Sequence, residues 1–411
     1  MASFYIPLSG LDSDSTALDT IANNLANMNT TCYKQQTVNF SDFFYTQIGE
    51  QGSGDLIQQG SGVQTAGIES QYTQGDITTT GNATDVAMDG NGFFVINDGG
   101  TNIFTRDGNF GLNSSGGLIT QGGQSVMGYP AVAGVVNTSA PLGAITVPVG
   151  SVEAPQASAN FGMTANLNAT AAVGTTVPAQ ITMYDSLGEP QVATVTYTKT
   201  ANNTWSYAIA LPAGAQTAAG TQTNNTGTLT FNASGNLTSP SAPVTGISFT
   251  SLTDGANDLT LNWNVLGASG TPTITQVNAA SAVTATNQDG FAAGQYQSFS
   301  ISANGTVTAS YSNGQTLAVG QLAVGNVANV QGLQLLGNGE YAATQASGTA
   351  AIGASGTGGL GTMQEGALEA SNVNISQEFS DLIIAQRAFE ANSKAVTTFD
   401  TVVQETINMI H

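Results

Sequence analysis

The last stretch of the sequence, residues 374–411, constrains the fold more than any other. It contains neither Gly nor Pro, although the chain carries 50 glycines. Large apolar residues recur there at seven-residue spacing, with others on the adjoining track, which is typical of a coiled-coil helix with a narrow apolar stripe. These residues are Phe379, Leu382, Phe389, Val396, Phe399, Val403, Ile407 and Ile410. Asn374 is suited to cap the first turn of such a helix.

The first 30 residues carry a matching pattern. Leu11, Leu18 and Leu25 are seven residues apart, and Ile21 and Met28 follow the last two of them by three residues. Two terminal helices with similar apolar residues can pair as an antiparallel hairpin, with the rest of the chain inserted between them. We call the apolar residues of both ends together the terminal stripe.

The terminal stripe predicts self-assembly. Burying about ten apolar side chains releases less free energy than ordering about sixty residues costs. We therefore expect other copies of the chain to cover the terminal stripe and to order both helices. The alternative interpretation is an ordinary pair of helices that pack on the core of their own domain.

The middle of the chain has the composition of β structure. Gly, Ala, Ser, Thr and Asn dominate, and short apolar or alternating runs such as 180–184 and 192–197 are separated by turn residues. We predict an α+β protein whose terminal α-helices form a coiled coil, with two mainly β domains, sandwich-like or barrel-like, inserted between them. The predicted segments are an N-terminal coiled-coil helix (1–30), a connector (31–75), the two halves of a β domain (76–148 and 287–361), an inserted outer β domain (149–286) and a C-terminal coiled-coil helix (362–411).

The charge of the chain argues against two classes of partner. Its formal net charge is −21, with only five Lys and Arg residues. Nucleic-acid binding requires a basic surface that displaces counterions, and an anionic membrane surface repels an acidic protein. Residues 1–10 lack the basic and apolar regions of a secretory signal peptide, and no apolar run is long enough to cross a bilayer. We expect no nucleic-acid partner, no membrane insertion, and either a cytoplasmic location or export that bypasses a signal peptide.

Catalytic and metal-binding patterns are weak throughout. The segments 89–92 and 107–109 resemble fragments of calcium loops, but neither has the Glu that closes an EF-hand, so we interpret them as hairpin turns. The single histidine, His411, is the last residue, which leaves no histidine elsewhere to act as base for a serine or for Cys32. We predict no enzymatic activity, no catalytic residues, no cofactor and no metal site.

Both ends of the sequence resemble the flagellar axial proteins, the family that builds the rod, hook and junction of the bacterial flagellum. The N-terminal residues that carry the resemblance are 23–27 (NNLAN) and 33–34 (YK), and the C-terminal ones are 369–373 (EASNV) and 385–389 (AQRAF). Cys32 departs from the pattern, since the family usually has Gly in the turn before the aromatic–Lys pair.

Within this family the sequence is most similar to the hook-forming members. The segments 184–188 (YDSLG), 320–323 (GQLA), 331–334 (QGLQ) and 366–369 (GALE) are similar to theirs. Rod proteins of the family are shorter and lack a domain corresponding to residues 150–285. The resemblance implies a subunit that polymerises into a curved, flexible tube, a universal joint that transmits motor torque from the rod to the filament.

The resemblance also implies a set of partners and a location. The subunits would leave the cell unfolded through the flagellar type III export apparatus and polymerise beneath a hook cap protein. The tube would join a distal rod protein at one end and a hook–filament junction protein at the other. The implied location is the basal body and hook of the bacterial flagellum, extracellular after export that does not use a signal peptide. Two alternatives remain at this point: a distal rod protein with an unusual insertion, or a non-catalytic surface adhesin.

Overall fold

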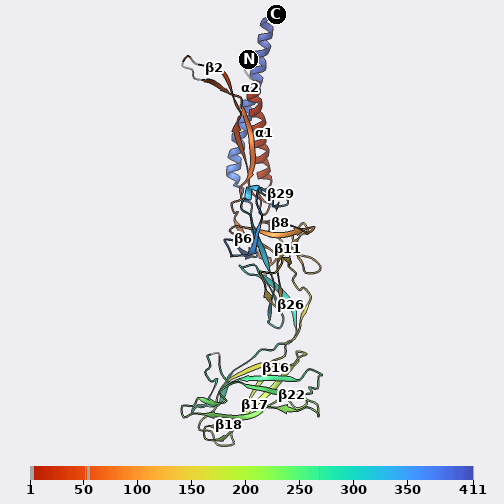
Figure 1. The fold of residues 1–411 in the computed structure, drawn as a ribbon, viewed down its shortest axis with the longest axis vertical. Coiled ribbons are helices and arrows are strands. Elements are labelled where there is room, and N and C mark those ends of the chain that lie inside the picture. Colours follow the sequence, from red (N-terminus) through yellow and green to blue (C-terminus); the bar gives the residue numbers. More distant parts are fainter. Residues whose placement is uncertain (1–3, 51, 53–55, 268, 411) are drawn as a thin grey trace. The chain divides into compact units, whose positions relative to one another are not determined.

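The computed structural model describes residues 4–50, 52, 56–267 and 269–410, which form two compact units. Unit 1 comprises Met1–Val149, Phe299–Ala309 and Thr316–His411, and unit 2 comprises Gly150–Ser298 and Ser310–Gln315. Unit 2 is therefore an insertion in the sequence of unit 1. Helices lie at both ends of the chain and the part between them is mostly β structure, so the predicted fold class is confirmed (Figure 1).

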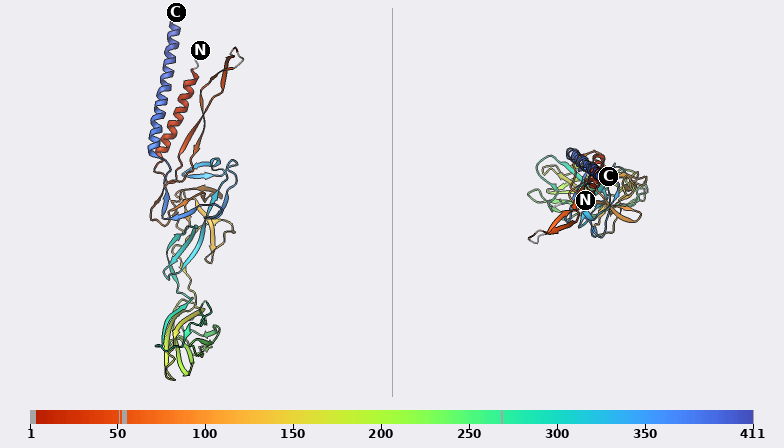
Figure 2. Two further views of the ribbon diagram at one scale, coloured as in Figure 1. Left: turned by 90° about the vertical axis from the view of Figure 1, so that its left-hand side faces the viewer. Right: turned by 90° about the horizontal axis from the view of Figure 1, so that it is seen from above.

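The two long helices of unit 1, α1 (Tyr5–Ala26) and α2 (Ile375–Ile410), run antiparallel side by side (Figures 1 and 2). Two contacts fix their directions. Asn24, near the end of α1, is hydrogen-bonded to Glu378 at the start of α2. Asp14, nearer the start of α1, is hydrogen-bonded to Asn392, farther along α2. The predicted antiparallel helix pair is confirmed.

Helix α2 begins later than the predicted segment 362–411. Residues 362–369 instead form strands β32 (Thr362–Glu365) and β33 (Ala367–Glu369), which pair with β6 (Val86–Asp89) and β5 (Ile77–Thr79). Gly366, between the two strands, has a φ of +66°, a left-handed conformation that interrupts a helix. The predicted cap is confirmed, because the Asn374 side chain accepts hydrogen bonds from the first N–H groups of α2.

A two-stranded antiparallel ribbon follows α1 in the sequence. It consists of β1 (Gln36–Asp42) paired with β4 (Val63–Ser70), and it is continued by β2 (Tyr45–Glu50) paired with β3 (Leu56–Gly60). The ribbon is attached to α1 at two points: the N–H of Val63 donates to Ser9 Oγ, and the N–H of Gln36 donates to Asn24 Oδ1. The connector predicted for residues 31–75 thus contains regular paired strands.

The β part of unit 1 surrounds a core of aromatic and branched side chains. Phe94 and Phe110 are in edge-to-face contact, and Phe93 packs against Tyr341. The remaining elements of this part are β7 (Phe93–Asp98), β8 (Thr101–Thr105), β9 (Gly111–Leu112), β10 (Leu118–Ile119), β11 (Ser125–Val132), β12 (Val135–Val136), β13 (Gly143–Ala144), β28 (Thr316–Asn326), the 3-10 turn η1 (Val330–Gly332), β29 (Gln334–Gly337), β30 (Glu340–Ala342) and β31 (Ala351–Ala354). Strands β26 (Gly294–Ile301) and β27 (Thr306–Tyr311) contribute residues to both units.

Two of the predicted hairpins are wrong. The turn at 89–92 joins β6 to β7, but β6 pairs with β32 while β7 pairs with β8, β11 and β28. The turn at 106–109 likewise joins β8 to β9, which do not pair with each other. Long-range partners displace the local ones in both cases. The turn at 114–117 does connect paired strands, β9 and β10.

Unit 2 consists of two sheets around one core. One sheet has the strand order β16-β17-β18-β20-β21, and the other has the order β19-β22-β23-β15-β24, with β25 also paired to β15. Their bounds are β15 (Asn160–Asn166), β16 (Thr176–Tyr184), β17 (Pro190–Ala201), β18 (Thr204–Ala210), β19 (Gln222–Thr223), β20 (Thr226–Phe231), β21 (Leu237–Ser239), β22 (Val244–Phe249), β23 (Leu259–Asn264), β24 (Ile274–Thr275) and β25 (Ala282–Gln288), with β14 (Val152–Glu153) paired to β26. Trp205 and Trp263 are fully buried in this core.

Candidate assembly surface of the terminal helices

Small and polar side chains form the contact between α1 and α2. Gly10 lies so close to α2 that an added Cβ would stand 2.6 Å from Asn392 Nδ2. The same Nδ2 donates a hydrogen bond to the Asp14 carboxylate at 2.8 Å. Asn24 Nδ2 donates to both carboxylate oxygens of Glu378, at 3.2 and 3.3 Å. Small and polar side chains thus supply these close contacts between the two helices.

The terminal stripe is left largely uncovered. The half-buried members are Leu11, Leu18, Ile21 and Leu25 of α1 and Leu382, Val396 and Phe399 of α2. The exposed members are Met28, Phe379, Phe389, Val403 and Ile407, and the four on α2 expose 39–54% of their surface. None of the described members is fully buried, and the side chain of Ile410 lies outside the described part. The structure therefore places these residues where further molecules can cover them.

The apolar surface of α2 is wider than the terminal stripe. Ile383 and Ile384 are 59% and 65% exposed, and Val402 and Met409 are exposed near the end of the helix. The seven-residue repeat did not predict these residues, because it selects one narrow stripe of the helix. The consecutive residues Leu-Ile-Ile at 382–384 place apolar side chains around the helix. That local triplet was the signal available in the sequence.

The end of α2 extends past the start of α1. Facing positions on the antiparallel helices have residue numbers that add to 402 or 406, as for Gly10 and Asp14 with Asn392. The first residue of α1, Tyr5, therefore lies at the level of about residue 397 to 401 of α2. Residues 401–409 are all exposed, so the last turns of α2 have no covering element within the described chain (Figure 2).

An apolar groove of about 770 Å³ lies beside the start of α1. Its lining includes Tyr5, Leu8 and Leu11 from α1 and Phe43, Phe44 and Val63 from the ribbon region. Tyr5 and Phe44 are 76% and 69% exposed. Exposed apolar surface that extends over two neighbouring elements is typical of a protein–protein contact.

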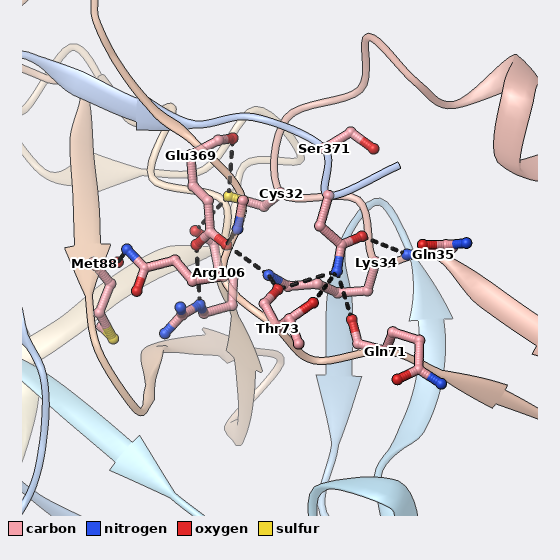
Figure 3. A network of polar contacts seen from close by, with 12 residues as sticks. Cys32, Lys34, Gln35, Gln71, Thr73, Met88, Arg106, Glu369 and Ser371 are labelled. Atoms are coloured by element: carbon pink, nitrogen blue, oxygen red, sulfur yellow. Dashed lines mark hydrogen bonds and ion pairs between the residues drawn. The ribbon is translucent and has the colours of Figure 1, made fainter. Parts of the chain in front are cut away.

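A buried ionic cluster joins the base of the helix pair to the β part of unit 1 (Figure 3). The Glu369 carboxylate, at the end of β33, forms ion pairs with Lys34 Nζ and with Arg106 Nε, the latter at 3.2 Å. It also accepts a hydrogen bond from the N–H of Gly75 at 2.9 Å. Lys34 comes from the segment after α1, so the cluster joins the two ends of the chain to one β body.

The two cations of this cluster have further acceptors. Lys34 Nζ donates to the carbonyl of Thr73 at 2.9 Å. Arg106 Nη1 donates to the carbonyls of Gly90 and Gly92, both at 2.7 Å. A buried ion cluster is tolerated when its donors and acceptors are satisfied in this way. The cluster is therefore suited to hold the helix bases in place, and it offers no free group for chemistry.

Glu378 forms a second polar contact at the base of α2. Its carboxylate accepts hydrogen bonds from Asn24 of α1 and from Gln35 Nε2, the latter at 2.6 Å. Burial raises the pKa of the Glu378 carboxyl above its ordinary value, and these two hydrogen bonds offset part of that rise. Burial of the neighbouring Tyr33 phenol raises its pKa above the ordinary value, and the negative charge of Glu378 raises it further.

Cys32 occupies a left-handed position in the turn that leads to Lys34, with a φ of +56°. Its side chain is buried, and its Sγ donates to the carbonyl of Arg106 at 2.9 Å. Burial raises the pKa of the Cys32 thiol. A buried, protonated thiol is a poor nucleophile, so its local role is packing.

The described residues show neither a metal-ligating group nor a membrane helix. No set of three or more His, Cys, Asp or Glu side chains in the described ranges could hold a metal ion. No helix in the described part is long and apolar enough to span a membrane. The apolar surface of the terminal helices is therefore the feature that best characterises this chain.

Four family models match the sequence in chain order. They are the flagella basal body rod protein (residues 4–34), the flagellar hook protein FlgE/F/G D1 domain (87–166), the flagellar basal body protein FlaE D2 domain (156–291) and the flagellar basal body rod FlgEFG protein C-terminal region (364–409). The first and last of these cover α1 and nearly all of α2. The third covers most of unit 2.

Full-length relatives and a solved structure agree with these matches. The chain is 34% identical to the flagellar hook protein FlgE of Salmonella typhimurium (99% of this chain, 100% of the relative) and 33% identical to that of Treponema pallidum (100% and 99%). Its fold is similar to that of the Helicobacter pylori flagellar hook protein FlgE2, with a TM-score of 0.53 at 15% identity over 71% of this chain and 100% of that chain. This chain belongs to the flagellar hook protein FlgE family.

Proposed function

We propose that this chain is the structural subunit of a bacterial flagellar hook, a curved and flexible tube that transmits torque from rod to filament. One observation carries the proposal. The terminal helices pair through Gly10, Asn24, Glu378 and Asn392, while the apolar terminal stripe remains half-buried or exposed. A helix pair with this surface is stabilised when neighbouring copies cover it, because burial of apolar area drives association.

The tube is a homopolymer in this proposal, and the chain has no catalytic function. Copies contact one another along the terminal helices and the apolar groove beside Tyr5 and Phe44. The polymer joins a distal rod protein at its base and a hook–filament junction protein at its tip, and it grows beneath a hook cap protein. Subunits reach this extracellular site unfolded, through the flagellar type III export apparatus.

Electron microscopy tests the proposal directly. Purified full-length chain is concentrated, salted out and imaged in negative stain, and its gene is expressed in a motile bacterium that lacks its own hook protein. We expect curved tubes in vitro and restored hooks on the cells. A straight polymer would instead indicate a rod protein. Monomers at every concentration, together with cells that remain without hooks, would refute the proposal.

A further inference from the structure

The chain contains four Asn-Gly sequences, at 91–92, 304–305, 313–314 and 338–339. Asparagine is a chemically labile residue, because the backbone nitrogen of the next residue can attack its side-chain amide. Glycine in the next position hinders this attack least, since it has no Cβ. The attack also requires that the side-chain amide and the backbone N–H are free to move. The four sites can therefore be compared by what holds these two groups in the folded chain.

Hydrogen bonds hold both groups at 304–305. The side-chain oxygen of Asn304 accepts hydrogen bonds from Ser302 Oγ at 2.6 Å and from the N–H of Thr306 at 3.1 Å. The N–H of Gly305 donates to the carbonyl of Ser302 at 2.7 Å. The attacking nitrogen and the amide that it would attack are thus both engaged, and the reaction must first break these hydrogen bonds.

The site at 313–314 is held in the same way. Asn313 Nδ2 donates to the carbonyl of Ala292 at 2.9 Å, and Asn313 Oδ1 accepts from the N–H of Gln315 at 3.0 Å. The N–H of Gly314 donates to the carbonyl of Tyr311 at 3.0 Å. This site therefore also has to open before its asparagine can react.

Packing holds the site at 91–92. Gly92 is buried, and an added Cβ there would overlap Val324 Cγ1. The carbonyl of Gly92 accepts a hydrogen bond from Arg106 Nη1 at 2.7 Å, and the carbonyl of Asn91 accepts one from the N–H of Gly361 at 2.7 Å. The backbone on both sides of the attacking nitrogen is therefore fixed by its surroundings.

The site at 338–339 differs from the other three. Asn338 and Gly339 form the turn between β29 and β30, and both have left-handed backbone conformations, with φ of +52° and +71°. Asn338 is exposed, and neither its side chain nor the N–H of Gly339 has a hydrogen-bond partner within the described part of the chain. The Thr105 hydroxyl donates to the carbonyl of Gly339 at 2.9 Å, which leaves both reacting groups free.

We propose that Asn338 is a site of spontaneous deamidation, which adds a negative charge to the cleft between the end of α1 and the β29–β30 hairpin. The Gly339 nitrogen forms a bond to Asn338 Cγ, the bond from Cγ to Nδ2 breaks, and Nδ2 leaves as ammonia with the proton from the Gly339 N–H. Water then opens the cyclic imide at either carbonyl, which leaves an aspartate or an isoaspartate. The net reaction consumes water and releases ammonia, with no oxidation or reduction.

The surroundings of Asn338 give the added charge a physical consequence. The cleft has a volume of about 620 Å³, and its lining includes Asn338, Asp107 and Glu340 together with Asn27 at the end of α1. Burial raises the pKa of the Glu340 carboxyl, and the charge of Asp98 raises it further. Another carboxylate at this cleft is repelled by those already there, and an isoaspartate also adds a methylene group to the backbone of the turn. Both changes should loosen the β29–β30 hairpin.

Incubation of the folded full-length chain in mildly alkaline buffer tests the proposal. Mass spectrometry of peptides from a protease digest then measures the conversion of amide to carboxyl at each Asn-Gly sequence. We expect conversion at Asn338 to be about tenfold faster than at Asn304 or Asn313, because those two sites must first break hydrogen bonds; tenfold corresponds to about 1.4 kcal/mol. Incubation in concentrated urea is the control, in which the four rates should become similar because the hydrogen bonds and packing are lost.

Two variants test the consequence for the hairpin. Asn338→Gly removes the reactive amide and tolerates the left-handed conformation, whereas Asn338→Asp carries the added charge from the start. We expect hydrogen exchange of the amides of β29 and β30 to become faster in Asn338→Asp and in the incubated native chain, and to stay unchanged when Asn338→Gly is incubated. Unchanged exchange in both Asn338→Asp and the incubated native chain would overturn the inferred loosening.

The outcomes separate this inference from the proposed function. Conversion at Asn338 no faster than at Asn304 and Asn313 in the folded chain would overturn the inference. The same ratio of rates in urea would also overturn it, because the difference would then come from the sequence and not from the fold. Every measurement uses the soluble chain, so a failure to polymerise would overturn the proposed function alone.

Discussion

Substitution of Glu369 by Gln gives the sharpest test of how the helix bases are held. In the native chain one buried carboxylate faces two buried cations, Lys34 and Arg106. The substitution leaves both cations buried without a countercharge, although each keeps a backbone carbonyl acceptor. Removing one partner of a buried ion pair costs about 3–5 kcal/mol. We expect unit 1 to lose about that much unfolding free energy.

A comparison within the cluster distinguishes charge imbalance from lost contacts. Lys34→Met removes one cation and leaves Glu369 paired with Arg106, so the remaining charges balance. We expect it to cost clearly less than Glu369→Gln. The matched surface control is Glu390→Gln, which removes the exposed ion pair with Arg387 and should cost less than about 1 kcal/mol.

The assay must report on unit 1 separately from unit 2. Both tryptophans, Trp205 and Trp263, lie in unit 2, so their fluorescence during urea unfolding serves as an internal control that should not change. Hydrogen exchange of the amides of β7 and β28 reports on unit 1. A loss below about 1 kcal/mol for Glu369→Gln, or an equal loss for Lys34→Met, would refute the reasoning that the cluster depends on this carboxylate.

Three further predictions address the terminal helices and the β part of unit 1. Val396→Asp should leave both units folded but raise the critical concentration for polymerisation more than about 100-fold, because an unpaired charge in an apolar contact costs several kcal/mol. Sedimentation measures this concentration, and Thr397→Asp, at an exposed position, is the control. The Glu378 carboxyl has a raised pKa in the folded state. Its contribution to the stability of unit 1 is therefore present below its ordinary pKa of 4.5 and is lost as the pH rises through its folded-state pKa. Glu378→Gln should flatten this decline of stability with pH, as measured by hydrogen exchange at several pH values. Gly108→Ala should destabilise unit 1 by about 1–3 kcal/mol or more, because its Cβ would overlap the carbonyl oxygen of Val86, whereas Gly111→Ala, with open space around it, should have little effect in the same assay.

Local sequence signals predicted the helices and several strands but not the pairing of distant strands. The absence of Gly and Pro from residues 374–411 was sufficient to predict α2, and alternation at 192–197 was sufficient to predict part of β17. The turn at 89–92 was misassigned because β6 pairs with β32, more than 270 residues later in the sequence. No local pattern contains information about such a partner.

The candidate site was predicted in part, for a similar reason. The terminal stripe follows from a repeat within each helix, and the structure places its described members at half-buried or exposed positions. The cluster of Lys34, Arg106 and Glu369 was not predicted, because its members lie far apart in the sequence and carry no shared motif. One signal was present in the sequence. The chain has only five basic residues, and basic residues are rarely buried unless they are paired.

The polar contact between α1 and α2 explains why assembly requires other copies. If apolar residues filled that contact, one chain would cover its own terminal stripe and gain little from a neighbour. Instead, hydrogen bonds from Asn24 to Glu378 and from Asn392 to Asp14 hold the helices together, and Gly10 permits their close approach. The net contribution of such hydrogen bonds is small and their geometry is specific. The pairing therefore fixes the direction and level of the helices, while the described members of the terminal stripe remain half-buried or exposed. We therefore expect cover of that surface by adjacent copies to be the larger source of stability, and the order of the terminal helices to depend on the polymer.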